Sequence, residues 1–109
     1  VNGRWTAGSY VLNTTILRNE WGFKGVVMTD WFANINEFGK APEKTNFAAM
    51  IRSQNDLYMV CPDGSYASTG DNTLQALSDG RLTRAELQRS AKNICQWHLD
   101  NNPLTQPIL

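Results

Sequence analysis

The 109-residue sequence has only two cysteines, a single histidine and no excess charge of either sign. Ten Lys and Arg residues balance ten Asp and Glu residues, so the formal net charge is zero and the pI is near 6.7. This balance argues against a nucleic-acid-binding protein, and against a protein that binds a membrane surface through basic charge. We therefore expect neither nucleic acid nor a membrane among its partners.

The scarcity of cysteine and histidine limits the chemistry that the chain can perform. Cys61 and Cys95 have no metal ligands at suitable spacing beside them, and two cysteines are more typical of a reduced cytosolic protein than of a disulfide scaffold. His98, near the end of a helical pattern, is typical of a solvated residue or one that interacts with a helix dipole. We expect no metal, no organic cofactor and a cytoplasmic location, with secretion left open.

Long hydrophobic runs are also missing. No apolar stretch approaches the roughly 20 residues of a transmembrane helix, and no charged segment followed by an apolar stretch indicates a signal peptide. With 41% hydrophobic residues and a mean hydropathy of −0.42, the composition is that of a globular protein of about one small domain. The start at Val1-Asn2-Gly3 indicates a processed product or a piece of a longer chain.

Helical and strand patterns alternate along the chain. Capping residues and apolar periodicity predict four helices, at about residues 9–21, 45–54, 73–78 and 84–100. Uninterrupted apolar residues predict two strands, at 26–28 and 57–60, of the kind that is buried on both faces of a parallel sheet. This alternation indicates an α/β protein built from βα units.

Two strands are too few for a stable parallel sheet, because their edges and one apolar face stay open. A complete (β/α)8 barrel takes about 250 residues. The chain is therefore expected to be a fragment of a larger α/β fold.

Functional side chains in such folds follow the carboxyl ends of the strands. Asp30 follows the first predicted strand, where a rigidly held carboxylate suits nucleophilic attack or proton transfer, and the indole of Trp31 suits the C–H face of a sugar ring. A capping Asp30 and a core Trp31 explain the same pattern equally well. Asp63, in a Pro-Asp-Gly turn, is better explained as a turn residue. Asp56, at the amino end of its strand, is expected to serve stability.

A longer match favours the catalytic interpretation. Asn2-Gly3 and residues 17–31, LRNEWGFKGVVMTDW, closely resemble the signature of glycoside hydrolase family 3, LR-x-EWGF-x-G-x-V-x-[ST]-DW. Residues 54–60 resemble the next barrel strand of that family, and 82–94 resemble the helix that follows.

This resemblance implies a retaining β-glucosidase-like enzyme with a (β/α)8 barrel. Residues 1–100 would form about the last two βα units of that barrel, and 101–109 an irregular tail. Asp30 would be the nucleophile and Trp31 would line the sugar site. The acid/base residue of the family comes from another domain, and its other sugar-binding groups come from earlier strands, so the chain holds half of the mechanism.

Retaining hydrolysis needs two carboxylates about 5–5.5 Å apart, and the sequence offers one well-placed carboxylate. We therefore expect the isolated chain to be inactive. Its expected partners are a β-glucoside or oligosaccharide, the remainder of a parent chain and, for the fragment alone, other copies of itself. A non-catalytic structural or interaction domain, or a weak sugar-binding module that keeps the Trp31 platform, is the alternative.

Overall fold

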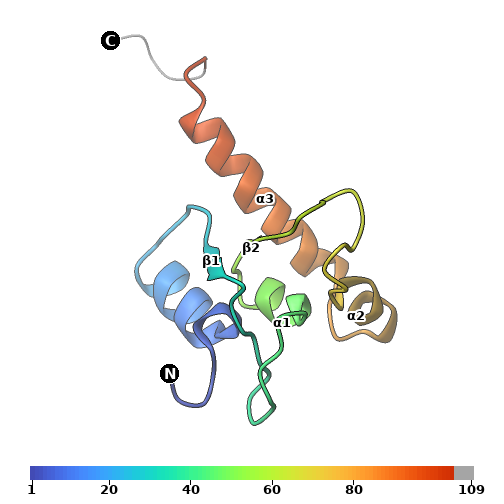
Figure 1. The fold of residues 1–109 in the computed structure, drawn as a ribbon. Helices are drawn as coiled ribbons and strands as arrows, with labels where there is room; N and C mark the ends of the chain where they lie inside the picture. Colours follow the sequence, from blue (N-terminus) through green and yellow to red (C-terminus); the bar gives the residue numbers. More distant parts are fainter. Residues whose placement is uncertain (105–109) are drawn as a thin grey trace.

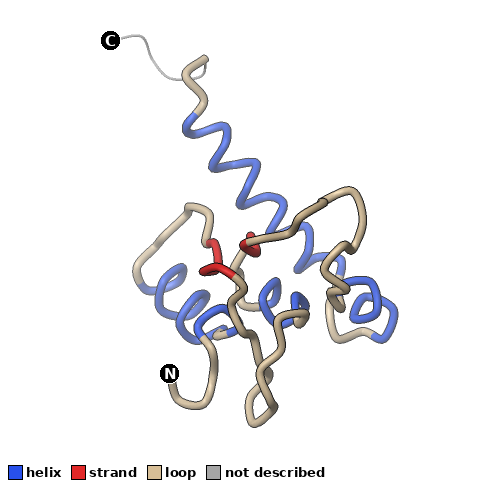
Figure 2. The backbone as a smooth tube through the Cα atoms, viewed as in Figure 1, coloured by secondary structure: helices blue, strands red, loops and turns tan. Residues whose placement is uncertain are grey.

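A computed structural model of the chain describes residues 1–104. In chain order the elements are η1 (Thr6–Gly8), η2 (Val11–Glu20), β1 (Met28–Trp31), α1 (Phe47–Arg52), β2 (Leu57–Met59), α2 (Thr73–Asp79) and α3 (Arg84–Asn101). The two strands pair in parallel, and helices precede and follow them (Figures 1 and 2). The predicted α/β class with two parallel strands is therefore confirmed. Of the expected tail, Asn101 belongs to α3, and 105–109 lie outside the described residues.

The first strand begins and ends later than predicted. The structure places it at Met28–Trp31, not at 26–28, because hydrogen bonding to the neighbouring strand continues through its polar residues. The amide of Phe32 still donates to the carbonyl of Met59, at 2.7 Å. Apolar character therefore indicated that a strand lies in this region, but it located neither end of the strand.

Burial on both faces of the sheet was also a wrong expectation for the described chain. The side chains of Met28 and Leu57, which are partners in the parallel register, are 53% and 41% exposed. The other elements leave one face of the two-stranded sheet uncovered, so the apolar residues on that face remain in contact with solvent.

The first long helix is wound as a π-helix. The amide of Trp21 donates to the carbonyl of Ile16 at 2.9 Å, the i to i−5 pattern of that helix. Its expected apolar face is only half-buried, and Asn13 and Thr14 are buried instead. Asn13 Nδ2 donates to the carbonyl of Thr6 at 2.8 Å, and the Thr14 hydroxyl donates to the carbonyl of Ser53 at 2.9 Å. Hydrogen bonds of these two buried polar side chains therefore help to attach the helix to η1 and to the end of α1.

The apolar core lies around α1, whose Ala48–Ile51 segment is buried. Ile35, which the sequence places in a plain loop, is fully buried there and forms an antiparallel bridge with Glu43. A Cβ atom on Gly8 would lie 2.9 Å from Ile35 Cγ2, so this glycine permits the close contact between η1 and the loop. The loop that follows β1 is thus anchored in the core.

The predicted capping box at the start of α3 is confirmed. The Thr83 hydroxyl accepts a hydrogen bond from the Glu86 amide at 3.2 Å, and the Glu86 carboxylate accepts one from the Thr83 amide at 2.8 Å. The N-terminal half of α3 packs against α1, and Arg89 donates to the carbonyl of Arg52 at 2.9 Å. The C-terminal half extends away from the other elements (Figure 1).

Candidate active site

The two residues expected to act on a sugar end the first strand. Asp30 and Trp31 are the last two residues of β1, and both side chains are exposed. The Trp31 amide donates to Asp30 Oδ1 at 2.7 Å, so the backbone of one residue holds the carboxylate of the other. An exposed carboxylate held at the carboxyl end of a parallel strand is placed where βα folds carry their chemistry.

A hollow of about 440 Å³ lies beside this carboxylate. Its wall combines aromatic and polar side chains, among them Trp5, Asp30, Trp31, Phe32, Asn34 and Asn55. Asn55 is buried, and its Oδ1 has no hydrogen-bond partner. Aromatic surfaces with a few polar groups are typical of sites that bind sugars and other small polar molecules.

Phe32 completes the aromatic wall of the hollow, and its functional importance was not predicted from the sequence. Its ring lies edge-on to that of Trp31, with centroids 6.1 Å apart and an interplanar angle of 61°. The ammonium group of Lys44 lies 5.7 Å from the centroid of the same ring. Its backbone has a φ of +49°, which is uncommon for an aromatic residue. An aromatic residue next to Trp31 was the available signal, but the left-handed turn that directs its ring was not visible in the sequence.

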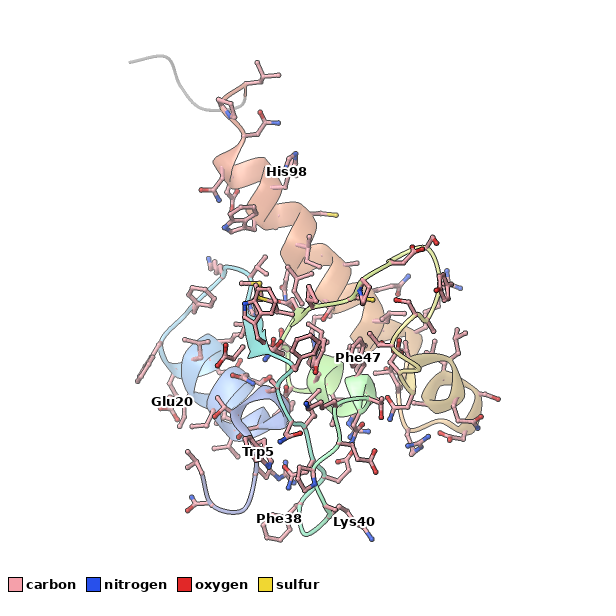
Figure 3. The ribbon with its side chains drawn as sticks, viewed as in Figure 1. Trp5, Glu20, Phe38, Lys40, Phe47 and His98 are labelled. Carbon is pink, nitrogen blue, oxygen red and sulfur yellow. The ribbon has the colours of Figure 1, made fainter. Side chains whose placement is uncertain are left out.

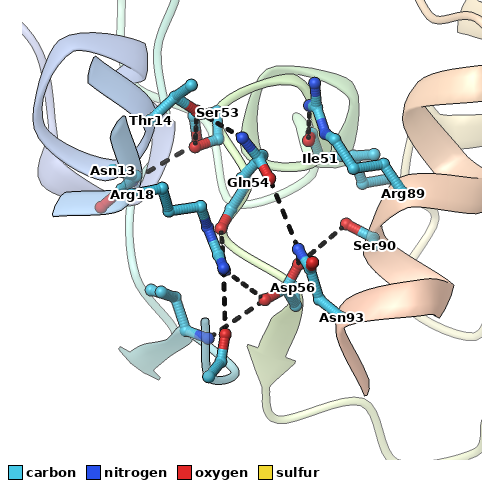
Figure 4. Close-up of polar contacts among 12 residues, drawn as sticks. Asn13, Thr14, Arg18, Ile51, Ser53, Gln54, Asp56, Arg89, Ser90 and Asn93 are labelled. Atoms are coloured by element: carbon cyan, nitrogen blue, oxygen red, sulfur yellow. Dashed lines mark hydrogen bonds and ion pairs between the residues drawn. The ribbon is translucent and has the colours of Figure 1, made fainter. Parts of the chain in front are cut away.

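The amino end of the sheet is fixed by a buried cluster around Asp56 (Figure 4). The carboxylate of Asp56 accepts hydrogen bonds from Arg18 at 2.7 Å, the Val27 amide at 3.1 Å, Ser90 at 3.2 Å and Asn93 at 3.0 Å. These donors come from η2, the segment before β1, and α3. All of its acceptor positions are used in holding elements together, in agreement with a structural role.

The second candidate segment, after β2, forms a turn. Asp63 is exposed, and its Oδ1 accepts hydrogen bonds from the amide of Ser65 at 2.9 Å and from the Ser65 hydroxyl at 2.7 Å. These bonds, the backbone one first, hold the pKa of Asp63 below its usual value. The turn interpretation of Pro-Asp-Gly therefore agrees with the geometry.

The remaining candidates lie apart from the hollow. His98 is exposed on the part of α3 that extends away from the sheet (Figure 3). Cys61 and Cys95 are free thiols. Among residues 1–104, no three His, Cys, Asp or Glu side chains gather into a possible metal site. No helix in this described part has both the length and the apolar character needed to cross a bilayer.

The family model for the glycosyl hydrolase family 3 N-terminal domain matches residues 1–97. The chain belongs to glycoside hydrolase family 3. It is 60% identical over 108 residues to a β-glucosidase of Ruminococcus albus, a match that covers 99% of this chain and 11% of that protein. It is 35% identical over 94 residues to an exo-α-(1→6)-L-arabinopyranosidase of Bifidobacterium breve, covering 86% of this chain and 10% of that protein.

Solved structures extend the likeness to the fold. A β-glucosidase from Paenibacillus barengoltzii superposes with a TM-score of 0.86 at 51% identity, covering 97% of this chain and 12% of that one. β-glucosidase 3B from Thermotoga neapolitana in complex with glucose superposes with a TM-score of 0.67 at 26% identity, covering 86% and 12%. The family 3 chain is thus a partial (β/α)8 barrel, and it spans about a tenth of the length of the relatives it matches.

Proposed function

We propose that this chain is the part of a retaining β-glycosidase that carries the catalytic nucleophile, and that the whole enzyme hydrolyses terminal β-glucosidic bonds. The observation that carries the proposal is the exposed Asp30 carboxylate at the carboxyl end of β1, beside a hollow walled by Trp31. A β-glucoside is favoured as substrate, because the relatives at 60% and 51% identity are both β-glucosidases.

In the first step an Asp30 oxygen attacks the anomeric carbon. The bond from that carbon to the leaving-group oxygen breaks, and the leaving oxygen takes a proton from a general acid supplied by the rest of the enzyme. In the second step water attacks the anomeric carbon and the ester bond to Asp30 breaks. The proton of that water goes to the same acid/base group, and Asp30 leaves as a carboxylate. No cofactor is needed to balance either step.

Trp31 binds the sugar in this proposal. Its indole is 65% exposed and adjoins the carboxylate through the backbone, so a pyranose ring stacked on it lies within reach of Asp30. The isolated chain has no access to the remaining barrel strands or to the acid/base group, and general acid catalysis alone contributes about 10²–10⁴-fold to rate. We therefore propose that the isolated chain is inactive. A cytoplasmic location remains a proposal based on composition.

The test uses a chimera in which this chain replaces the matching 108 residues of the Ruminococcus albus β-glucosidase. The chimera is expected to hydrolyse nitrophenyl β-glucoside, and the isolated chain is not. Asp30→Gly should abolish turnover while leaving glucose binding, and azide should restore part of the activity with an activated aryl glucoside, because it occupies the space of the lost carboxylate.

A 2-fluoro glucoside that traps the glycosyl-enzyme should label the chimera on the peptide containing Asp30, with Asp63→Asn as the matched carboxylate control. Label on a different carboxylate, or near-normal turnover by Asp30→Gly, contradicts the proposed function. Glucose binding without any labelling or turnover favours the sugar-binding module instead.

A further inference from the structure

The strand β1, in which Asp30 is the last residue but one, contains one residue more than the segment of β2 with which it pairs. In the parallel register Met28 is opposite Leu57, and Trp31 is opposite Met59. Four residues of β1, Met28–Trp31, are therefore opposite three residues of β2, Leu57–Met59, and the pairing is irregular between Met28 and Trp31. An extra residue of this kind is a β-bulge, which interrupts the ladder and changes the direction of the side chains near it.

A side chain takes part in the contact between the strands at the bulge. The amide of Met59 donates a hydrogen bond to Thr29 Oγ1 at 2.8 Å. Thr29 is only 5% exposed, so water has little access to this bond. The Thr29 hydroxyl thus joins β1 to β2 at the residue before Asp30, inside the irregular part of the pairing.

Met59 holds the other side of the bulge as well. Its carbonyl accepts a hydrogen bond from the Phe32 amide at 2.7 Å. Phe32 is the residue with φ of +49°, so this bond fixes a backbone conformation that is costly for an aromatic side chain. The two polar groups of one residue in β2 therefore fix β1 immediately before Asp30 and immediately after Trp31.

We propose that Thr29 is a positioning residue for the reaction: its hydroxyl accepts a hydrogen bond from the Met59 amide at the bulge and so directs the Asp30 carboxylate into the hollow. The inference rests on the proposed role of Asp30 as nucleophile. Loss of the hydroxyl allows β1 to shift relative to Met59, and the attacking oxygen shifts with it. A misplacement of about 1 Å costs roughly 100-fold in rate.

Two substitutions separate the hydroxyl from the rest of the side chain. Thr29→Ser keeps the acceptor and removes a methyl group. Thr29→Val keeps the branched shape but removes the oxygen that accepts the hydrogen bond of the Met59 amide. Thr14→Val is the matched control, because Thr14 is also buried and its hydroxyl also bonds a backbone group, the carbonyl of Ser53. Thr14 lies on η2, and its hydroxyl bonds the segment after α1 and not β1.

All variants are made in the same chimera. The reaction with the 2-fluoro glucoside is allowed to go to completion, and the amount of labelled protein then gives the number of competent active sites. Thr29→Val is expected to lower kcat per labelled site about 100-fold with KM changed less than about threefold. Thr29→Ser and Thr14→Val are expected to retain kcat per labelled site. Poor folding lowers the number of labelled sites and not the rate at each site, so stability losses are counted separately.

Hydrogen exchange of the Met59 amide supplies a readout that does not depend on activity. It should be slow in the unmodified chimera and in Thr29→Ser, and fast in Thr29→Val. If Thr29→Val keeps its rate per site, or if Thr29→Ser loses the rate equally, the hydroxyl does not position Asp30 and the inference is wrong. The labelled peptide of the unmodified chimera tests the proposed function separately. Label on a residue other than Asp30 contradicts the role of Asp30 as nucleophile, whatever the Thr29 variants show.

Discussion

Arg18 and Asp56 form a buried ion pair that joins η2 to the start of β2, with Nη2 of the arginine 2.7 Å from Oδ2 of the carboxylate. The two side chains are only 7% and 0% exposed. Arg18 also donates to the carbonyls of Gly25 and Gln54, both at 3.0 Å. The pair therefore fixes the segment that leads into β1, at the opposite end of the strand from Asp30.

Asp56→Asn should destabilise the chain by about 3–5 kcal/mol, because it leaves the Arg18 guanidinium buried without a counter-charge. An amide also offers one acceptor oxygen where the carboxylate offers two, so some of the donors around Asp56 lose their partner. Urea unfolding at one fixed protein concentration measures the change.

The control for this prediction is Asp79→Asn, which removes the exposed ion pair with Arg81. Exposed pairs contribute little, so this change should be much the smaller of the two. Equal losses in the two variants would show that the Arg18–Asp56 pair stabilises the fold no more than a surface pair does.

Trp31→Ala in the chimera should raise KM for an aryl β-glucoside about tenfold, since a stacked aromatic surface is worth roughly 1.4 kcal/mol or slightly less. Trp31→Phe should keep most of the affinity because it retains an aromatic face. Trp97→Ala removes an equally large, half-exposed indole from α3, away from the hollow, and is expected to leave KM unchanged. Steady-state kinetics of the three variants decide whether Trp31 contacts the sugar.

The Asp79 carboxylate accepts hydrogen bonds from Arg81, and these hold its pKa below the usual value. A carboxyl group whose pKa is lowered by folding stabilises the folded chain above its unfolded pKa, and that contribution is lost as the pH falls through the folded value. A carboxyl NMR titration should therefore show Asp79 ionising below a model aspartate. In Arg81→Gln its pKa should rise toward the ordinary value, and an unchanged titration would remove Arg81 as the cause.

Local signals in the sequence predicted the capping residues at helix ends well. Thr83 and Glu86 cap α3 as their spacing indicated, and Gly22 follows η2 with a φ of +70°. These features depend on residues within one turn of each other, so no distant contact is needed to specify them. The parallel strands were also predictable, because apolar runs between helices leave few other arrangements.

Features that depend on distant residues were not predictable. Thr29 and Asp30 look like a strand terminator, and only the pairing of Trp31 with Met59 shows that the strand continues through them. Ile35 appears as a loop residue until Gly8 and α1 surround it. Asp30 and Trp31 were singled out by their place after the first predicted strand, and the family signature favoured a catalytic role for them, whereas Phe32 needed the backbone geometry.

The isolated chain should associate with itself, because its sheet has an open apolar face. Met28 and Leu57 lie side by side in the register with 53% and 41% of their surfaces exposed. Contact between two such faces removes apolar surface from water at about 25 cal/mol per Å², which favours association as concentration rises. Sedimentation velocity across a wide concentration range should show a rising average mass.

The double variant Met28→Glu and Leu57→Lys tests whether this face is the cause, because charged groups on it oppose its burial while their opposite signs keep the net charge unchanged. It should sediment as a monomer at concentrations where the unmodified chain associates. Leu74→Glu, which alters an exposed leucine on α2 away from the sheet, should associate like the unmodified chain. If Leu74→Glu abolishes association and the double variant does not, the contact lies on the helical surface and not on the open sheet.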